Sequence, residues 1–486
     1  MEKSAWVAAG LTATVVATSL GYLTLDAMDV VPGFITTRAP EARVVQPPTL
    51  PGLEVNWAES ASPLGEELSD EAIAAIRSAV RDFSGASVFG AREITQEPAS
   101  PAGPGESAPP PTVRSVPAAR TGVVVIDSVT GEQIAGANET TPLTPASTLK
   151  TLAGMTVLGR VGAAKTLTTD VMISGETLYL RGGGDIYLAE DAGDPKAVAG
   201  RAGLGDLARQ TAQILETMNI SGVALFLDDT LFDPESDWNP NWAGSEGYVG
   251  KVTPIAMHGT FEPEVGYYSD PAMSAAEVFS QRLSEAGITV KGDLKRMKTP
   301  SAARLLTSVE SAPVFDLVSK SLKDSNNTST EVECRLAAIA AGKPATFDGA
   351  TQAVQEFLQQ AGVDTTGLVM DDCSGLSDRS KVTPKTLVSV LQVSRRSTQF
   401  PQLHLFDSAL ALAALDGTLD HRYLEDTPLL RAKTGSLSTV ASLAGTLVTQ
   451  SGRPLDFAII SDGFPEGSLY GARTVIDELI YAISEQ

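Results

Sequence analysis

The chain has 486 residues, of which 43% are hydrophobic and 20% are charged, and this composition predicts a well-buried globular core spread over two or three domains. Its formal net charge of −23, without any cluster of lysine and arginine, argues against nucleic acid as a partner, because a phosphate-binding surface needs concentrated positive charge. The three histidines, His258, His404 and His421, lack the spacing of metal ligands, so we expect neither a metal site nor a cofactor.

Residues 5–25 contain no charged side chain and, at about 1.5 Å per residue, could cross a hydrocarbon core of about 30 Å. Only Lys3 precedes them as a basic residue, and no clear small-x-small cleavage site follows. A retained membrane anchor within residues 1–28 is therefore favoured slightly over a removed signal peptide, with a buried core helix as the remaining alternative. Both favoured interpretations place the rest of the chain outside the cytoplasm, secreted or held at the cytoplasmic membrane by this segment alone. The oligomeric state stays open.

Residues 29–118 are expected to form a Pro-rich linker that contains one short helix. That helix is predicted over Ser69–Phe83, because Ser69 can cap it and apolar residues recur at helical spacing. The stretch Glu97–Arg120 is rich in Pro, Gly, Ala and Ser and has little apolar surface to pack, so we expect a flexible spacer.

A first globular domain is expected from residues 119–165 and 305–486. Its first strand is the apolar run Thr121–Asp127, which continues through Thr130-Gly131 into a hairpin. Thr144 is then expected to cap a helix whose first turn contains Pro145 and Ser147. Lys150 follows three residues after Ser147, on the same helical face.

About 170 residues separate Lys150 from Ser325, which is more than a connection within one domain needs, so residues 166–304 are expected to form an insert. Strands are predicted within Leu167–Asp185 and Val223–Asp229. Helices are predicted over Leu204–Met218 and, after a break at Pro271, over Ala275–Ala286.

The chain is then expected to return to the first domain through two helices, Val314–Lys323 and Thr330–Ala341. A strand pair, Thr434–Thr449 and Pro454–Ser461, is predicted to turn at Ser451-Gly452, and a helix over Tyr470–Ile483 closes the chain. The hairpins near the two ends of this domain should share one antiparallel sheet.

Three short motifs follow one another in chain order and together predict a single serine acyl-transfer site. They are Ser147-Thr148-Leu149-Lys150, Ser325-Asn326-Asn327 and Lys433-Thr434-Gly435. Each has an ordinary explanation when taken alone, because Ser-x-x-Lys occurs by chance, Ser-Asn-Asn makes helix caps and Lys-Thr-Gly can end a strand. Their order, the helix-start context of the first and the strand context of the third favour the chemical interpretation.

Ser147 is the expected nucleophile and Lys150 its general base, because a serine hydroxyl needs a neighbouring base at neutral pH. Lys150 can act only when neutral, so its pKa must be lowered by burial or by a nearby cation such as Lys433. Ser325 would relay protons between the lysines and the leaving amine. The other expected roles are in substrate binding: Asn327 holds an amide, Lys433 and Thr434 bind a carboxylate, Gly435 leaves room for a substrate strand, and the amides of Ser147 and Ser436 meet the oxyanion.

The region from Gly122 to Gln486 resembles low-molecular-mass penicillin-binding proteins of the D-alanyl-D-alanine carboxypeptidase/endopeptidase type, a family with a large insert between its first two motifs. The segments that carry the resemblance are TPLTPASTLK (Thr141 to Lys150), GGGD (Gly182 to Asp185), DDTLFD (Asp228 to Asp233), DDCSGLSDRSKVTP (Asp371 to Pro384), DGTLDHR (Asp416 to Arg422) and RAKTGSL (Arg431 to Leu437). The implied fold class is α+β: a penicillin-binding/β-lactamase-like transpeptidase domain, whose antiparallel sheet has helices on both sides, with a large β-rich inserted domain.

The resemblance also implies the reaction. Ser147 would attack the D-Ala-D-Ala carbonyl of peptidoglycan stem peptides, release the terminal D-Ala and pass the acyl group to water, and penicillin and other β-lactams would acylate the same serine. An acidic residue of the insert, Asp229 or Asp233, would receive the side-chain ammonium of the peptide, although either could instead cap a turn after a strand. Cleavage of peptide cross-links by the same site stays open.

Two other functions compete with this one. A β-lactamase shares the motif set, but the chain has no E-x-x-x-N-like segment placed to supply a second base, and it is larger than that compact class. A catalytically inactive wall-binding protein of the same scaffold is the other alternative, and the intact Ser147, Lys150, Ser325 and Lys433 argue against it.

The only two cysteines are Cys334 and Cys373. An even count in an exported chain allows one disulfide, but two buried thiols are an equal alternative, since the sequence alone does not show whether the two Cα atoms are close enough for a bond.

Two departures from the family's pattern stand out: Cys373 occupies a position where a small residue is expected, and the segment from Trp238 to Tyr248 is hard to align.

Overall fold

The computed structural model describes residues 65–486 except 97–111, 117, 243, 264–265 and 425–427. The expected anchor within residues 1–28 and the Pro-rich segment after it lie outside the described residues. Within the described part of the chain, no helix combines the length and the apolar character that a membrane span requires.

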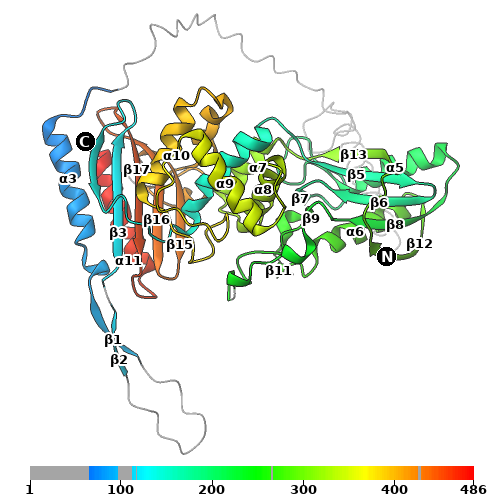
Figure 1. Cartoon of the computed structure of the whole chain (residues 1–486), viewed down its shortest axis with the longest axis horizontal. Helices are drawn as coiled ribbons and strands as arrows, with labels where there is room; N and C mark the ends of the chain where they lie inside the picture. The colour runs from blue at the N-terminus through cyan, green and yellow to red at the C-terminus, as the bar shows by residue number, and fades with distance from the viewer. Residues whose placement is uncertain (1–64, 97–111, 117, 243, 264–265, 425–427) are drawn as a thin grey trace, which may run out of the picture. The chain divides into compact units, whose positions relative to one another are not determined.

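The centre of the first domain is a six-stranded sheet in the order β14-β15-β16-β17-β3-β4, with every neighbouring pair antiparallel (Figure 1). Its strands are β3 (Arg120–Asp127), β4 (Gln133–Ala137), β14 (Ala411–Leu412), β15 (Leu429–Leu437), β16 (Val440–Val448) and β17 (Pro454–Asp462). The pairing of β17 with β3 joins the two ends of the domain, as in the register Ile459 to Val123. The prediction of one shared antiparallel sheet is confirmed.

Both faces of this sheet are buried, which explains why β3 is an unbroken apolar run. Val123 and Val125 belong to one core cluster, and Val124 and Ile126 belong to another, because successive side chains of a strand point to opposite faces. On the first face lie α3 (Asp70–Ser84) and α11 (Leu469–Ser484). On the other face lie α4 (Lys150–Val157) and α10 (Pro384–Arg396), and α8 (Asn327–Ala340) packs against α4.

The helix predicted within the linker is found at the predicted residues. Its assignment to a linker is wrong, because it packs into the globular domain. The hydroxyl of Ser69 accepts a hydrogen bond from the Ala72 amide at 3.1 Å, so Ser69 caps α3 as expected. Ile76 and Val80 of α3 are buried in the same cluster as α11. Burial of this apolar stripe makes α3 part of the globular domain. A further hairpin, β1 (Arg92–Gln96) with β2 (Thr112–Val116), lies partly within the expected spacer.

The described part of the first domain has seven further helical elements. They are η1 (Ser87–Phe89), η2 (Ala146–Leu149), η3 (Leu158–Gly162), α7 (Val314–Lys323), α9 (Phe347–Ala361), η7 (Pro401–Ala409) and η8 (Gly417–Leu419). Of these, η1 and η8 belong to the core that contains α3 and α11, and the other five to the core that contains the first two motifs. The prediction of α7 is confirmed, whereas α8 begins three residues earlier than predicted because Asn326 caps it through the Ser329 amide. Helices α9 and α10 were not predicted.

The insert has a sheet and a core of its own. The five strands lie in the order β12-β8-β6-β5-β13, with two parallel pairs, and a separate cluster of buried apolar residues packs against them. The elements are β5 (Thr168–Ser174), β6 (Thr177–Gly182), β7 (Asp185–Leu188), α5 (Leu204–Thr217), β8 (Gly222–Asp228), η4 (Pro234–Ser236), η5 (Pro240–Trp242), β9 (Ile255–Met257), η6 (His258–Thr260), β10 (Phe261–Glu262), β11 (Gly266–Tyr267), α6 (Pro271–Glu285), β12 (Thr289–Arg296) and β13 (Arg304–Glu310).

Three further boundaries differ from the predictions. The insert extends to Glu310 rather than residue 304, because β13 pairs with β5. Pro271 begins α6 instead of breaking the chain, since Asp270 caps the helix through the Met273 amide and proline suits a first helical position. The strand predicted over Thr434–Thr449 is really β15 and β16, joined by a tight turn that the apolar pattern conceals.

Candidate active site

Ser147 lies in the short 3₁₀ turn η2, immediately before α4. The expected helix cap by Thr144 is wrong: its amide and hydroxyl both bind Oδ2 of Asp462, each at 3.1 Å, and η2 has no side-chain cap. Instead, the hydroxyls of Thr148 and Ser442 both donate to the carbonyl oxygen of Pro145, at 2.7 and 2.6 Å. These hydrogen bonds hold the turn against β16 of the central sheet. The local sequence does not predict them, because Ser442 is far from the turn along the chain.

Lys150 is completely buried and its ammonium nitrogen has three partners. Nζ lies 2.8 Å from Oγ of Ser147, 2.6 Å from Oδ1 of Asn327 and 2.7 Å from the carbonyl oxygen of Ser374. The amide and carbonyl oxygens can only accept hydrogen bonds, so when the amine of Lys150 is neutral they take its two N–H groups. The lone pair is then left for the hydroxyl proton of Ser147. This arrangement suits a lysine that removes a proton.

The protonation state of Lys150 follows from its burial. Burial lowers the pKa of Lys150 from 10.5 to about 7, although the nearby carboxyls of Asp372, Glu331 and Glu333 act in the opposite direction. Those acids are themselves buried, and burial raises the pKa of each one. A substantial neutral fraction of Lys150 is thus present near neutral pH.

The carbonyl of Ser374 that Lys150 contacts belongs to a loop held by two buried acids. Oε1 of Glu331, on α8, accepts hydrogen bonds from the backbone amides of Cys373 and Ser374, at 3.0 and 2.8 Å. Asp372 accepts the amides of Gly375 and Ser377 at 3.0 and 2.7 Å. The loop conformation is therefore specified by two carboxylates, neither of which belongs to the three catalytic motifs.

A disulfide ties the same loop to α8. Cys334 and Cys373 are bonded, with Cα atoms 6.6 Å apart, which decides between the two alternatives that the sequence left open. Cys373 replaces an expected small residue because it forms this bond. Since α8 also begins with Asn327, the disulfide links the two elements that bind Nζ of Lys150.

The second motif supplies one contact with Lys150 and one with the insert. Asn327 accepts from Lys150 through Oδ1, and its Nδ2 donates to the carbonyl of Tyr248 at 2.9 Å. The amide of Asn327 is therefore occupied by protein groups, and its expected contact with a substrate amide stays a prediction. Ser325 has a left-handed backbone, with φ of 55°, and its hydroxyl makes no hydrogen bond to another described residue. The proton relay through Ser325 also stays a prediction.

The third motif lies on β15. Lys433 is buried, and Nζ donates to the carbonyl of Thr434 at 2.8 Å. Burial, and then repulsion by Lys150, lower the pKa of Lys433. The hydroxyl of Thr434 donates to that of Thr418 at 2.8 Å, and Ser436 Oγ accepts from Arg473 at 2.8 Å.

Among the residues that the structure describes, no strand pairs with the outer edge of β15 where the motif lies. Strand β14 pairs with β15 only at Arg431 and Ala432, whereas β16 pairs with the opposite edge as far as Leu437. Backbone groups of the motif can therefore receive an added strand.

Gly435 is required by close packing within the protein, while its expected role in leaving room for a substrate stays a prediction. A Cβ atom at this position would lie 2.2 Å from Oγ of Ser442, 2.8 Å from the carbonyl of Pro145 and 2.9 Å from the amide of Thr148. The glycine thus lets β15 approach the turn that carries Ser147.

A segment of the insert completes the site, and sequence reasoning missed it. The amide of Gly250 donates to Oγ1 of Thr328 at 2.8 Å, next to the contact of Tyr248 with Asn327. The indole of Trp242 donates to Asp372 at 2.9 Å. One sequence feature could have indicated that this segment contacts the site: Asn and Trp residues are concentrated between positions 238 and 242, in the segment that was hard to align.

The two insert acids expected to bind an ammonium group have other partners. Asp229 accepts from Nε of Arg296 at 2.8 Å, and Asp233 caps η4 through the Glu235 amide at 3.0 Å. Among the residues that the structure describes, no group of His, Cys, Asp and Glu is arranged to hold a metal ion.

Comparison with known proteins identifies the family to which the chain belongs. The sequence model of the D-Ala-D-Ala carboxypeptidase 3 (S13) family matches residues 112–265 and 263–481, so the chain belongs to this family of serine hydrolases. It is 30% identical over 358 residues to a carboxypeptidase of Mycobacterium tuberculosis, covering 70% of this chain and 75% of that protein. It is also 30% identical over 373 residues to Carboxypeptidase DacB of Mycolicibacterium smegmatis, covering 73% of this chain and 78% of the relative.

A solved structure shares the fold. The crystal structure of penicillin binding protein 4 (dacB) from Haemophilus influenzae matches with a TM-score of 0.60 and 21% identity, over 75% of this chain and 96% of that one. The predicted fold class, a penicillin-binding-type domain with a β-rich insert, is confirmed.

Proposed function

We propose that this protein is a serine D-alanyl-D-alanine carboxypeptidase in which Ser147 forms the acyl-enzyme and Lys150 is the general base. The family supports the reaction, and one geometric observation supports the assignment of the residues. That observation is the position of buried Nζ of Lys150, 2.8 Å from Oγ of Ser147, with its other two partners both acceptors.

In acylation, neutral Lys150 takes the hydroxyl proton as Oγ of Ser147 bonds to the carbonyl carbon of the penultimate D-Ala. The negative charge on the carbonyl oxygen is met by the backbone amides of Ser147 and Ser436, a device whose single donors are worth about 2.7 to 4 kcal/mol. The C–N bond then breaks, the proton passes to the leaving amine directly or through Ser325, and the terminal D-Ala departs. Water hydrolyses the ester with Lys150 again as the base.

Lys433 and Thr434 would bind the carboxylate of the terminal D-Ala. The open outer edge of β15 supports binding of the peptide as an additional strand, because β14 stops at Arg431 and Ala432. A β-lactam carries an equivalent carboxylate and amide, so penicillin would acylate Ser147. A peptide cross-link has the same carbonyl with a different amine, which keeps endopeptidase activity open.

Glu246 is a better candidate than Asp229 or Asp233 for the side-chain ammonium of the peptide. It is exposed and lies in the segment of the insert whose Tyr248 carbonyl contacts Asn327. Glu246→Gln should raise KM for a stem peptide with a free side-chain ammonium and leave KM for its acetylated form unchanged. An equal change for both peptides would exclude this role.

The uncharged residues 5–25 support a location outside the cytoplasm, where peptidoglycan is found, with the chain anchored to the membrane or secreted. Fractionation of cells into membrane and soluble fractions, with mass analysis of the mature N-terminus, distinguishes the two forms.

Labelling with a fluorescent penicillin tests the proposed function. The wild-type protein should acquire a covalent label, and Ser147→Ala should acquire none while keeping its circular dichroism spectrum. An unlabelled wild-type protein would support the inactive wall-binding alternative, and rapid loss of the label with release of hydrolysed penicillin would support a β-lactamase.

A further inference from the structure

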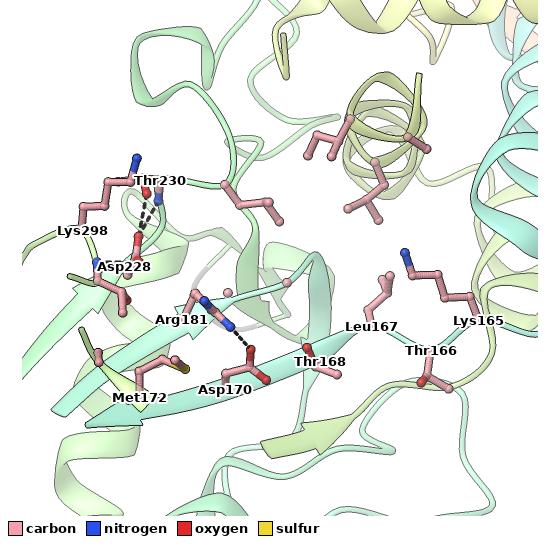
Figure 2. Close-up of a pocket in the computed structure, with 18 of the residues that line it drawn as sticks. Lys165, Thr166, Leu167, Thr168, Asp170, Met172, Arg181, Asp228, Thr230 and Lys298 are labelled. Carbon is pink, nitrogen blue, oxygen red and sulfur yellow. Dashed lines mark hydrogen bonds and ion pairs between the residues drawn. The ribbon is translucent and has the colours of Figure 1, made fainter. Parts of the chain in front are cut away.

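A large open cavity lies between the insert and the C-terminal half of α8. Its volume is about 690 Å³, and its walls come from β5 and β6, from the segments that follow β8 and β12, and from α8 (Figure 2). This volume is large enough for a peptide fragment, since ligand sites commonly measure about 300–1,000 Å³. None of the three motifs contributes a residue to it.

The cavity has more positive charge than its acidic residues neutralise. Arg181 is paired with Asp170 at 2.6 Å, and the carboxylate of Asp228 is occupied by Thr230 and the amide of Thr299. Lys165 and Lys298 line opposite ends of the cavity, and neither has an ion-pair partner among the described residues (Figure 2). The lining's three cations (Lys165, Lys298 and Arg181) and two carboxylates (Asp170 and Asp228) leave one net positive charge, which favours an anionic ligand in a chain with a net charge of −23.

The rest of the lining suits an aliphatic body. Leu336 and Ile339 of α8 line one wall, and Leu231 lines another. Ile339 is 38% exposed and Leu231 is 36% exposed, so both are accessible to a ligand. The cavity thus combines apolar walls with cations at its ends, which fits a short peptide that carries carboxylates and small aliphatic side chains.

The cavity and the catalytic serine lie toward opposite ends of one helix. Helix α8 has 14 residues, so it is about 20 Å long; Asn327, which contacts Lys150, is at its start, while Leu336 and Ile339 are in its second half. A D-Ala-D-Ala terminus bound at Ser147 cannot reach that far. A different part of a polymeric substrate can.

We propose that this Lys165–Lys298 cavity is an accessory site for the carboxylate-bearing stem peptide of a second strand in polymeric peptidoglycan. The inference rests on the proposed function and extends it from the scissile peptide to the polymer. Lys165 and Lys298 bind carboxylates of that second peptide, and the apolar walls contact its alanine side chains. Occupancy of the site holds the polymer against the enzyme without changing the chemistry at Ser147.

The test compares two double variants that remove the same charge. Lys165→Gln/Lys298→Gln changes the cavity, whereas Lys291→Gln/Lys295→Gln changes exposed lysines of β12 that do not line the cavity. D-Ala release is measured from insoluble peptidoglycan, from the same material with every carboxylate except that of the terminal D-Ala amidated, and from a free pentapeptide. The cavity variant should lose about twofold to thirtyfold in kcat/KM on native peptidoglycan, as expected for two exposed ion pairs, and the loss should shrink at high salt.

On the amidated polymer, the pentapeptide and penicillin, the cavity variant should match the wild type. Equal activity of both double variants on native peptidoglycan would overturn the proposal, as would an equal loss on the pentapeptide. Sedimentation of the protein with peptidoglycan in a Ser147→Ala background measures binding without turnover. If the wild type releases no D-Ala, the proposed function fails, and this binding measurement still decides the role of the cavity.

Discussion

Glu331 accepts a hydrogen bond from the backbone amide of Ser374 at 2.8 Å, and the carbonyl oxygen of Ser374 accepts one from Lys150. A buried carboxylate on α8 therefore fixes the orientation of a carbonyl that is one of three partners of Lys150. Positioning of the base depends on this indirect contact as well as on the motif residues themselves.

Replacement of Glu331 tests this dependence. Glu331→Leu leaves the amides of Cys373 and Ser374 buried without an acceptor, at about 1–3 kcal/mol each, so we expect a lower melting temperature and slower acylation by penicillin. Glu331→Gln keeps an acceptor oxygen and should restore most of the rate. Glu333→Leu is the matched control, because Glu333 is a buried acid of the same helix that binds Ser321 instead of the loop. Equal acylation rates of Glu331→Leu and the control would exclude the positioning role.

The pH dependence of acylation follows from the burial of Lys150. Only neutral lysine can accept the proton of Ser147, and its pKa is lowered to about 7, so the neutral fraction rises with pH through 7. The second-order rate constant for acylation should therefore increase between pH 5 and 8 and then level off. Stopped-flow measurements with a chromogenic β-lactam check this. A midpoint near 10, where an exposed lysine titrates, would contradict the assignment.

Gly435→Ala should disturb the turn that carries the nucleophile. The added methyl group would meet Ser442, Pro145 and Thr148 at distances below those of ordinary contacts, and such overpacking costs about 1–3 kcal/mol. We expect a lower melting temperature and slower acylation. Gly85→Ala serves as the control, because a Cβ atom there meets only ordinary contacts at 3.6 Å and beyond. If Gly435→Ala acylates as fast as this control, the close packing of β15 against the turn is not needed.

Removal of the disulfide should destabilise the loop that holds Lys150. Cys334→Ala/Cys373→Ala opens a link across 39 residues, and loss of such a constraint costs about 2–4 kcal/mol. Thermal unfolding should occur at a lower temperature in the double variant, and added reductant should have no further effect on it. An unchanged melting temperature would show that the Glu331 and Asp372 contacts hold the loop by themselves.

The motif residues were predictable because each motif is local. Ser147 and Lys150 are three positions apart, and a helix start necessarily places them on one side, which the structure bears out as a 2.8 Å contact. The pairing of β3 with β17 was predictable because both strands are long apolar runs, whereas the turn between β15 and β16 was not.

The support of the site was not predictable because it is made by long-range contacts. Glu331 and Asp372 are acids that ordinary patterns place on a surface, and their burial depends on the folding of the 371–377 loop onto α8. Thr144 looked like a helix cap, but Asp462, which lies near the other end of the domain, binds its hydroxyl. The packing role of Gly435 could not be predicted, because the sequence does not show which backbone segments lie against β15.

The most direct test of the central claim is mass spectrometry of the products and of the enzyme itself, with a defined pentapeptide that ends in D-Ala-D-Ala. We predict release of one D-Ala per peptide by the wild type and transient attachment of the remaining acyl group to the tryptic peptide that contains Ser147. Neither should occur with Ser147→Ala. Release of D-Ala by that variant at the wild-type rate, or attachment of the acyl group to another residue, would contradict the account.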